Sequence, residues 1–202
     1  MNYAYTDRQE LQKPGAGLPW FERIALNAAV KTGAAVMTDK YVLRWINRDA
    51  AELLRLADCE DESYDVTDPI ITPRVIGIED SSRNWSVLMV LEHLCLVNTE
   101  MIKLIQALSN GIVPRGEIDV ALYKPEEDID YEVLTRFQKL DAEYTNVVGE
   151  LIKHHGSLQL PARCKHPWFG LLNAHHWHCL AAFHQRVHLR QMQKIIAMLG
   201  VA

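Results

Sequence analysis

The sequence predicts an all-α protein, and more specifically a four-helix bundle. Apolar residues recur at helical spacing in four long segments of the chain. The connections between these segments differ in length, as they do in many bundles. No stretch of convincing length alternates apolar and polar residues as a half-buried strand would. The 202 residues suit one domain with a proper core, which we place over residues 1–202.

The chain begins with a polar segment, residues 1–18, which includes the run KPGAG. Such a segment is typical of a loose lead-in, and we expect it to pack on another subunit. A helical pattern follows from Pro19 to Ala57. We expect this pattern to break into two pieces, in the neighbourhoods of Gly33 and Thr38.

The first connection, residues 58–83, is rich in turn-forming residues. Pro69 and Pro73 exclude a helix interior there, because proline lacks the backbone N–H that a helix needs. Long ordered connections are often functional or interfacial. Ser81 or Ser82 is expected to cap the helix that follows.

Three further helical segments are predicted, at about residues 84–109, 130–154 and 169–199. The first of these ends at Asn110-Gly111 and the second at Gly156, since glycine favours the backbone conformation that stops a helix. The connections between the segments contain proline, which cannot continue a helix.

The composition excludes several classes of function. Hydrophobic residues make up 49% and charged residues 23% of the chain, which is the balance of a soluble globular protein. The formal net charge of −5 argues against nucleic acid as a partner and against a polybasic membrane-surface protein. No apolar run predicts a membrane span, and no targeting segment is recognisable. The four cysteines form no C-x-x-C pair, which indicates reduced thiols in a cytoplasmic protein.

Two histidines near the end of the chain suggest a metal site. His184 and His188 lie four residues apart in the last helical segment. Four residues advance about 40° around a helix, so both side chains share one face and their ring nitrogens can converge on one ion. The pair alone decides little, because a chain with nine histidines places some of them four apart by chance.

His93 is the third candidate ligand. It lies in the apolar phase set by Trp85 and Met89, so it should face the core of the bundle. Taken alone, it is better explained as a hydrogen-bonded core residue, since a buried imidazole needs partners for its nitrogens. Three neighbouring imidazoles, however, are explained together by one divalent ion. Three protein ligands with one open position are typical of a catalytic site.

The remaining histidines are weaker candidates. His175 and His178 lie well off the face that carries His184, and we interpret them as surface or loop-packing residues. His166 precedes a proline and is expected in a turn. Trp177 is expected to pack in the core, with a wall of a pocket above the metal as its alternative role.

No catalytic residue can be assigned from the pattern. Glu92 and Glu100 flank His93 in the sequence, and either could act as a general base or hold a metal ligand in place. Solvated helix faces and capping explain both residues better, so the catalytic residues stay unknown.

Two stretches of the chain carry a family resemblance. These are WSVLMVLEHL in the second helical segment and HPWFGLLNAHHWHCLAAFHQRVHLRQMQKI around the last one. In order and spacing they resemble the DinB/YfiT-like superfamily, over roughly residues 83–199. The resemblance implies a four-helix bundle with up-down-down-up topology and a divalent metal ion, nickel or zinc. By position, the metal ligands would be His93, His184 and His188.

The resemblance also bears on chemistry and assembly. Family members of known chemistry use small thiols, as thiol-dependent S-transferases or isomerases, and homodimers are common among them. This chain departs from the family in its long N-terminal portion and in the extended connection at residues 58–83. Both departures affect what is expected of the dimer and of the substrate pocket.

The leading hypothesis is therefore a metal-dependent enzyme with a small-molecule substrate. It would activate water or a low-molecular-weight thiol for transfer or hydrolysis, as a divalent-metal-dependent S-transferase or hydrolase. The alternative from another class is a non-catalytic, stress-linked bundle that binds a metal or a small ligand. A third hypothesis dispenses with the metal and makes the histidines hydrogen-bonded core residues.

Overall fold

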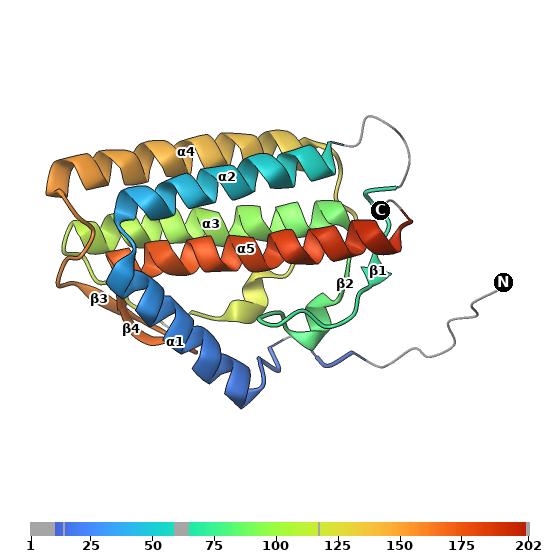
Figure 1. Cartoon of the computed structure of the whole chain (residues 1–202), viewed down its shortest axis with the longest axis horizontal. Coiled ribbons are helices and arrows are strands. Elements are labelled where there is room, and N and C mark those ends of the chain that lie inside the picture. Colours follow the sequence, from blue (N-terminus) through green and yellow to red (C-terminus); the bar gives the residue numbers. More distant parts are fainter. Residues whose placement is uncertain (1–10, 14, 59–64, 117, 201–202) are drawn as a thin grey trace.

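The computed structural model describes residues 11–13, 15–58, 65–116 and 118–200, and the chain is mainly helical there. This confirms the predicted all-α class. Figure 1 shows the long helices lying together, with short strands and connections gathered at one side. The helices are α1 (Trp20–Val36), α2 (Asp39–Ala57), α3 (Val87–Ser109), α4 (Glu132–His155) and α5 (Ala174–Met198).

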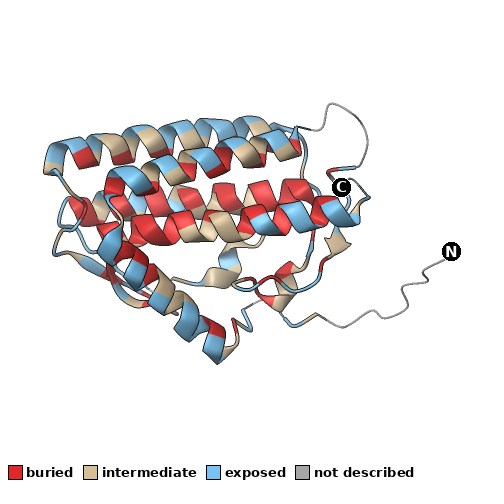
Figure 2. Ribbon diagram, viewed as in Figure 1, coloured by how far each residue is buried: buried red, intermediate tan, exposed pale blue. Residues whose placement is uncertain are grey.

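Four of the helices pack against one another along their lengths. Both α2 and α3 contact α4 and α5, whereas α1 is inclined to the others and contacts α5 (Figure 1). Buried positions concentrate on the faces turned inward, and α3 and α5 are the most extensively buried helices (Figure 2). Trp177, Tyr144 and Phe137 are the largest of the fully buried side chains. The core therefore lies between the helices, as their apolar spacing predicts.

The first predicted segment splits into α1 and α2, as expected. α1 ends at Val36, and α2 begins after Thr38, whose hydroxyl accepts a hydrogen bond from the backbone N–H of Tyr41 at 3.3 Å. Gly33 does not end α1. A side-chain carbon at this position would lie 2.8 Å from the Phe183 ring, so the glycine lets α1 approach α5 closely.

The predicted cap of α3 was wrong. Ser86, not Ser81 or Ser82, caps this helix, and its hydroxyl accepts a hydrogen bond from the backbone N–H of Met89 at 3.1 Å. Ser82 lies instead in the 3₁₀ turn η1 (Asp80–Ser82). Strand β2 (Asn84–Trp85) pairs antiparallel with β1 (Ile70–Ile71) and delays the start of the helix.

A second hairpin precedes α5. Strands β3 (Arg163–His166) and β4 (Gly170–Asn173) pair antiparallel. The last helix consequently begins at Ala174, later than the predicted residue 169, and the Asn173 side chain caps it by accepting from the His176 N–H at 3.0 Å. The four strands in the described part of the chain are two to four residues long, too short for an alternating pattern to be recognised.

Part of the N-terminal segment lies against the connection between α2 and α3. The backbone N–H of Gly17 donates to the Glu79 carboxylate at 2.9 Å, and that of Gln12 donates to Asp80 at 2.9 Å. Leu18 is buried. Residues 1–10 of the predicted lead-in lie outside the described residues.

Two expectations from composition concern membranes and thiols. Among the described residues, no helix combines the length and the apolar run needed to cross a lipid bilayer. Cys95, Cys164 and Cys179 are buried free thiols, and Cys59 lies outside the described residues.

Candidate metal centre

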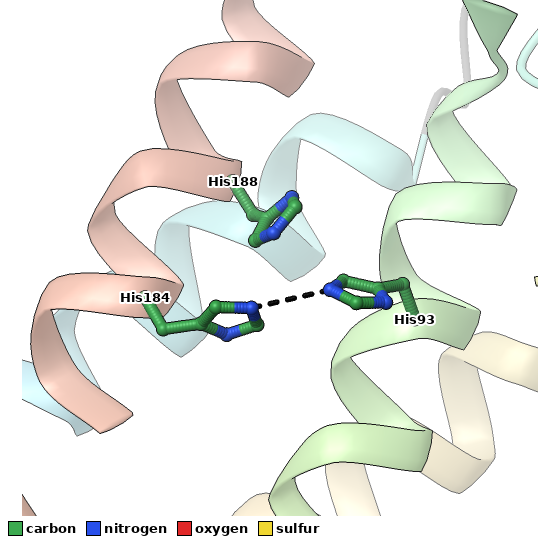
Figure 3. Close-up of side chains that lie close together, drawn as sticks. All are labelled: His93, His184 and His188. Carbon is green, nitrogen blue, oxygen red and sulfur yellow. Dashed lines mark hydrogen bonds between the residues drawn. The ribbon is translucent and has the colours of Figure 1, made fainter. Parts of the chain in front are cut away.

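Three histidines from two helices meet between α3 and α5. His93 comes from α3, and His184 and His188 come from successive turns of α5 (Figure 3). Each offers one ring nitrogen, and these three atoms all lie within 4.8 Å of one another. Nitrogens bound at about 2.0–2.1 Å to a tetrahedral ion are separated by about 3.3 Å. The 3.2 Å between Nε2 of His93 and Nε2 of His184 fits that spacing, so the cluster could hold a metal ion.

The His188 ring is held by Gln191. The Gln191 amide donates to the backbone carbonyl of Ser82 at 2.6 Å, so its own oxygen faces Nδ1 of His188, at 2.8 Å. An amide oxygen only accepts, so Nδ1 must carry the proton. Nε2 of His188 therefore has a free lone pair, which is the form that binds a metal.

His93 is held in the same tautomer by a different partner. Its Nδ1 lies 2.6 Å from the backbone carbonyl of Tyr123, in the 3₁₀ turn η2 (Val120–Tyr123). Because a carbonyl only accepts, Nδ1 donates and Nε2 keeps its lone pair. That lone pair points toward His184 from across the gap between the helices (Figure 3).

His184 completes the cluster and has no such partner. Its Nδ1 is enclosed and makes no hydrogen bond within the described residues. Without an ion, Nε2 of His184 can donate its proton to the lone pair on Nε2 of His93. With an ion on Nε2, the proton must sit on Nδ1, where the described part of the protein supplies no acceptor.

Burial keeps all three imidazoles neutral at pH 7. It lowers the pKa of His93 to about 4 and that of His184 to about 3, and it holds the pKa of His188 well below its usual range. The Lys124 ammonium adds to the effect at His93 and His188. Neutral imidazole is the metal-binding form, so no proton has to be displaced from an imidazolium before an ion binds.

Aromatic and basic groups close one side of the cluster. The Trp85 ring stacks on His188, with the ring planes 14° apart and the centroids 5.8 Å apart. The Lys124 ammonium lies over the Trp85 ring, 5.5 Å from its centre, and pairs with the Glu79 carboxylate at 3.0 Å. The pairing with Glu79 partly offsets the charge of Lys124, whose remaining effect disfavours protonation of His93 and His188.

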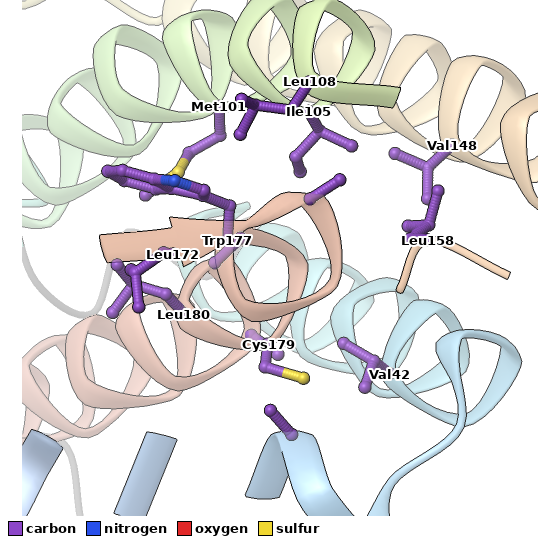
Figure 4. Packing of buried hydrophobic residues seen from close by; sticks show 14 of the residues in the cluster. Val42, Met101, Ile105, Leu108, Val148, Leu158, Leu172, Trp177, Cys179 and Leu180 are labelled. Atoms are coloured by element: carbon purple, nitrogen blue, oxygen red, sulfur yellow. The ribbon is translucent and has the colours of Figure 1, made fainter. Parts of the chain in front are cut away.

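A cavity of about 560 Å³ adjoins the cluster, and all three histidines line it. Trp177 lines it as well, which agrees with its alternative role as a pocket wall. It is also buried among the core residues drawn in Figure 4, as its expected packing role requires. Most of the remaining wall is apolar and includes Val30, Val97, Leu104, Leu180, Phe183 and Val187. The volume and the walls suit an organic molecule of moderate size.

The two glutamates that the sequence singled out are engaged elsewhere. Glu92 pairs with Arg136 of α4. Glu100 lines the cavity but pairs with Lys103 at 2.7 Å. Neither carboxylate forms a hydrogen bond with a histidine of the cluster. Glu100 fits the solvated-face explanation, since its side chain is 48% exposed, whereas Glu92 is held in an ion pair with only 13% of its side chain exposed.

Three histidines were misplaced by the sequence analysis. His175 and His178 are fully buried, not at the surface, and both contact Asp39 at the start of α2. His166 is a buried strand residue that lines the cavity, not a turn residue. In β3 exposed and buried residues alternate, but over four residues only, and so short a pattern cannot be recognised from sequence.

The chain matches no protein-family model, and no curated protein resembles it closely enough to count as a relative.

Proposed function

We propose that the chain is a metal-dependent enzyme of the DinB-like class, which activates water or a small thiol for transfer or hydrolysis. One observation carries the proposal: Gln191 and Tyr123 fix His188 and His93 so that both present an Nε2 lone pair beside His184. A divalent ion bound by the three nitrogens would lower the pKa of a water or thiol and so provide a nucleophile at neutral pH.

The protein's own groups would perform the other tasks. Three nitrogen ligands leave a coordination position for a small molecule. The cavity beside the cluster gives that molecule a route and a binding volume. Its apolar walls would hold the substrate in position, which lowers the entropic part of the barrier.

We further infer the up-down-down-up topology that the resemblance implies. The direction of the chain supports it, because in Figure 1 the colours run one way along α2 and α5 and the opposite way along α3 and α4. The His-x-x-x-His pair on α5 and the single histidine on α3 are then the ligands expected by position.

We also propose the metal and the partners. Imidazole ligands suit zinc and nickel, so we favour these ions. The apolar cavity suits a small-molecule substrate, with a low-molecular-weight thiol as the nucleophile. A homodimer in the cytoplasm follows from the resemblance and from the cysteine usage.

A second candidate function is a non-catalytic bundle that binds a metal or a small ligand. The observation that favours its metal-free, ligand-binding form is the 3.2 Å contact between Nε2 of His93 and Nε2 of His184, which one shared proton can satisfy without an ion. The cavity would then be the functional part of the protein.

Metal content and turnover together test the proposal. Purified protein is dialysed against zinc or nickel, and bound metal is measured beside a His184→Ala, His188→Ala variant. His154→Ala serves as the matched control, because His154 is exposed at the end of α4. We expect one ion in the parent and the control and none in the double variant. Thiol and electrophile panels then separate an enzyme from a binding protein, and equal metal content in all three proteins would refute the ligand set.

A further inference from the structure

The cavity carries two further N–H groups that the metal centre does not use. Trp177 and His166 both line it, both are more than nine-tenths buried, and their ring centroids are 5.3 Å apart. Nε1 of Trp177 is enclosed and has no hydrogen-bond partner among the described residues. Nδ1 of His166 accepts a hydrogen bond, whereas its Nε2 makes none within the same part of the chain and is not enclosed like Nε1 of Trp177.

Both groups are neutral donors. The backbone N–H of Trp168 donates to Nδ1 of His166 at 3.0 Å, so Nδ1 holds a lone pair and the ring proton must sit on Nε2. Burial also lowers the pKa of His166 to about 3, which keeps the ring uncharged. The indole nitrogen of Trp177 can only donate. A buried donor without an acceptor is costly, so the unpaired Nε1 of Trp177 indicates that something else supplies an oxygen there.

The charges around the cavity favour an uncharged acceptor. Three cations belong to its lining: Lys124 pairs with Glu79, Lys103 pairs with Glu100, and Arg115 is exposed to solvent. A carboxylate placed against His166 would lose its hydration without gaining an ion pair. A carbonyl oxygen gains the same two hydrogen bonds at a much smaller desolvation cost.

We propose that His166 and Trp177 form a subsite that binds the carbonyl oxygen of an apolar ketone, ester or amide inside the cavity. Both residues line the same cavity as the three histidines of the metal centre. The inference that this carbonyl compound is the substrate of the reaction rests on the proposed function. The inference that the subsite binds a carbonyl oxygen does not depend on that function.

Indole N–H resonances test the subsite directly. The chain has five tryptophans, and the Trp177 resonance is identified by its loss in Trp177→Phe. Labelled protein is titrated with 2-octanone, octanoate and octylamine, which share a chain length and differ in the polar end. We expect a saturable downfield shift of the Trp177 indole proton with 2-octanone, and binding weaker by about tenfold or more with the two charged ligands.

Variants at His166 sharpen the test. His166→Phe should weaken 2-octanone binding by about tenfold, as expected for the loss of one hydrogen bond. His166→Gln keeps a side-chain N–H and should recover part of the affinity. Lys165→Ala is the matched control, because Lys165 is exposed on the same strand and should bind the ketone as the parent does.

The outcomes separate this subsite from the metal-dependent function. Ketone binding by a protein that takes up no zinc would remove the proposed function and leave the subsite. Zinc uptake and turnover without a shift of the Trp177 indole proton would support the proposed function and refute the subsite. The subsite is also refuted if octanoate binds as tightly as 2-octanone, or if His166→Phe binds the ketone like the parent, since water would then satisfy the two donors.

Discussion

His175 and Asp39 form a buried ion pair in which the histidine must carry a positive charge. Nδ1 of His175 lies 2.6 Å from the Asp39 carboxylate, and Nε2 lies 2.8 Å from the backbone carbonyl of Ala34. Both partners can only accept, so both ring nitrogens donate. The second carboxylate oxygen of Asp39 accepts from Leu158 N–H at 3.1 Å and from the Ser157 hydroxyl at 3.2 Å. The pair thus joins α1, α2, α5 and the connection after α4.

The stability of the protein should therefore fall at alkaline pH. Burial opposes the charge on His175, but its bonds to Asp39 and to other neighbours raise its pKa from 6.5 to about 10. A raised pKa in the folded state contributes stability that is complete below pH 6.5 and is lost as the pH rises through about 10. Urea unfolding at pH 6.5, 8 and 10 should show this decline in the parent and a much flatter profile in His175→Leu.

The same pair predicts a large effect of mutation. His175→Leu leaves Asp39 buried without its cation and should cost about 3–5 kcal/mol at neutral pH. His154→Leu is the control, since His154 is exposed at the end of α4.

At acid pH the same pair should also lose stability. Burial raises the pKa of Asp39, but its hydrogen bonds with His175 and Leu158 lower the pKa overall, so that part of the stability is lost as the pH falls below 3.8. A parent protein as stable at pH 10 as at pH 6.5 would contradict this account.

The misreading of His175 has a simple physical origin. It lies on the side of α5 opposite His184, as the helical spacing predicts. The sequence interpretation gave α5 one buried face, whereas α1 and α2 cover the other side as well. A helix buried on two sides has no solvent-facing stripe there, and spacing alone cannot reveal that.

The three candidate ligands could be found from sequence because each follows a helical period. His184 and His188 are one turn apart, and His93 shares the apolar phase of α3. The residues that orient these histidines could not be found in the same way. Tyr123 orients His93 through its backbone carbonyl, which no side-chain pattern records. Gln191 orients His188 through its side-chain oxygen, and the distant carbonyl of Ser82 holds the Gln191 amide in place. Such partners depend on how connections fold over the helices.

Gln191 provides a direct test of metal-site orientation. Gln191→Leu removes the acceptor that fixes the His188 tautomer, so the affinity for zinc should fall by about 10–100-fold. Gln193→Leu is the matched control, because Gln193 is exposed two residues further along the helix. Competition with a chromophoric chelator measures both affinities. An unchanged affinity in Gln191→Leu would show that His188 does not depend on this hydrogen bond.

Tyr144 should stabilise the fold through a single hydrogen bond. Nε2 of His178 lies 3.1 Å from the Asp39 carbonyl and must donate, so Nδ1 accepts from the Tyr144 hydroxyl at 2.8 Å. Tyr144→Phe leaves that buried nitrogen unpaired and should cost about 1–3 kcal/mol in urea unfolding. Tyr131→Phe, at an exposed position, should be close to neutral. Equal stabilities for the two variants would mean that water replaces the hydroxyl.

Two helical glycines should respond to alanine in opposite directions. At Gly33 the new carbon would lie 2.8 Å from the Phe183 ring and 2.7 Å from the flexible end of Met37. Met37 can move away, but the ring is packed at 5.1 Å from Trp45, so Gly33→Ala should cost about 1–3 kcal/mol. At Gly149, on α4, nothing lies within 4 Å, and Gly149→Ala should gain up to about 1 kcal/mol through the lower backbone entropy of the unfolded chain. Thermal unfolding distinguishes the two. A stabilised Gly33→Ala protein would mean that α1 does not rest on α5 through this contact.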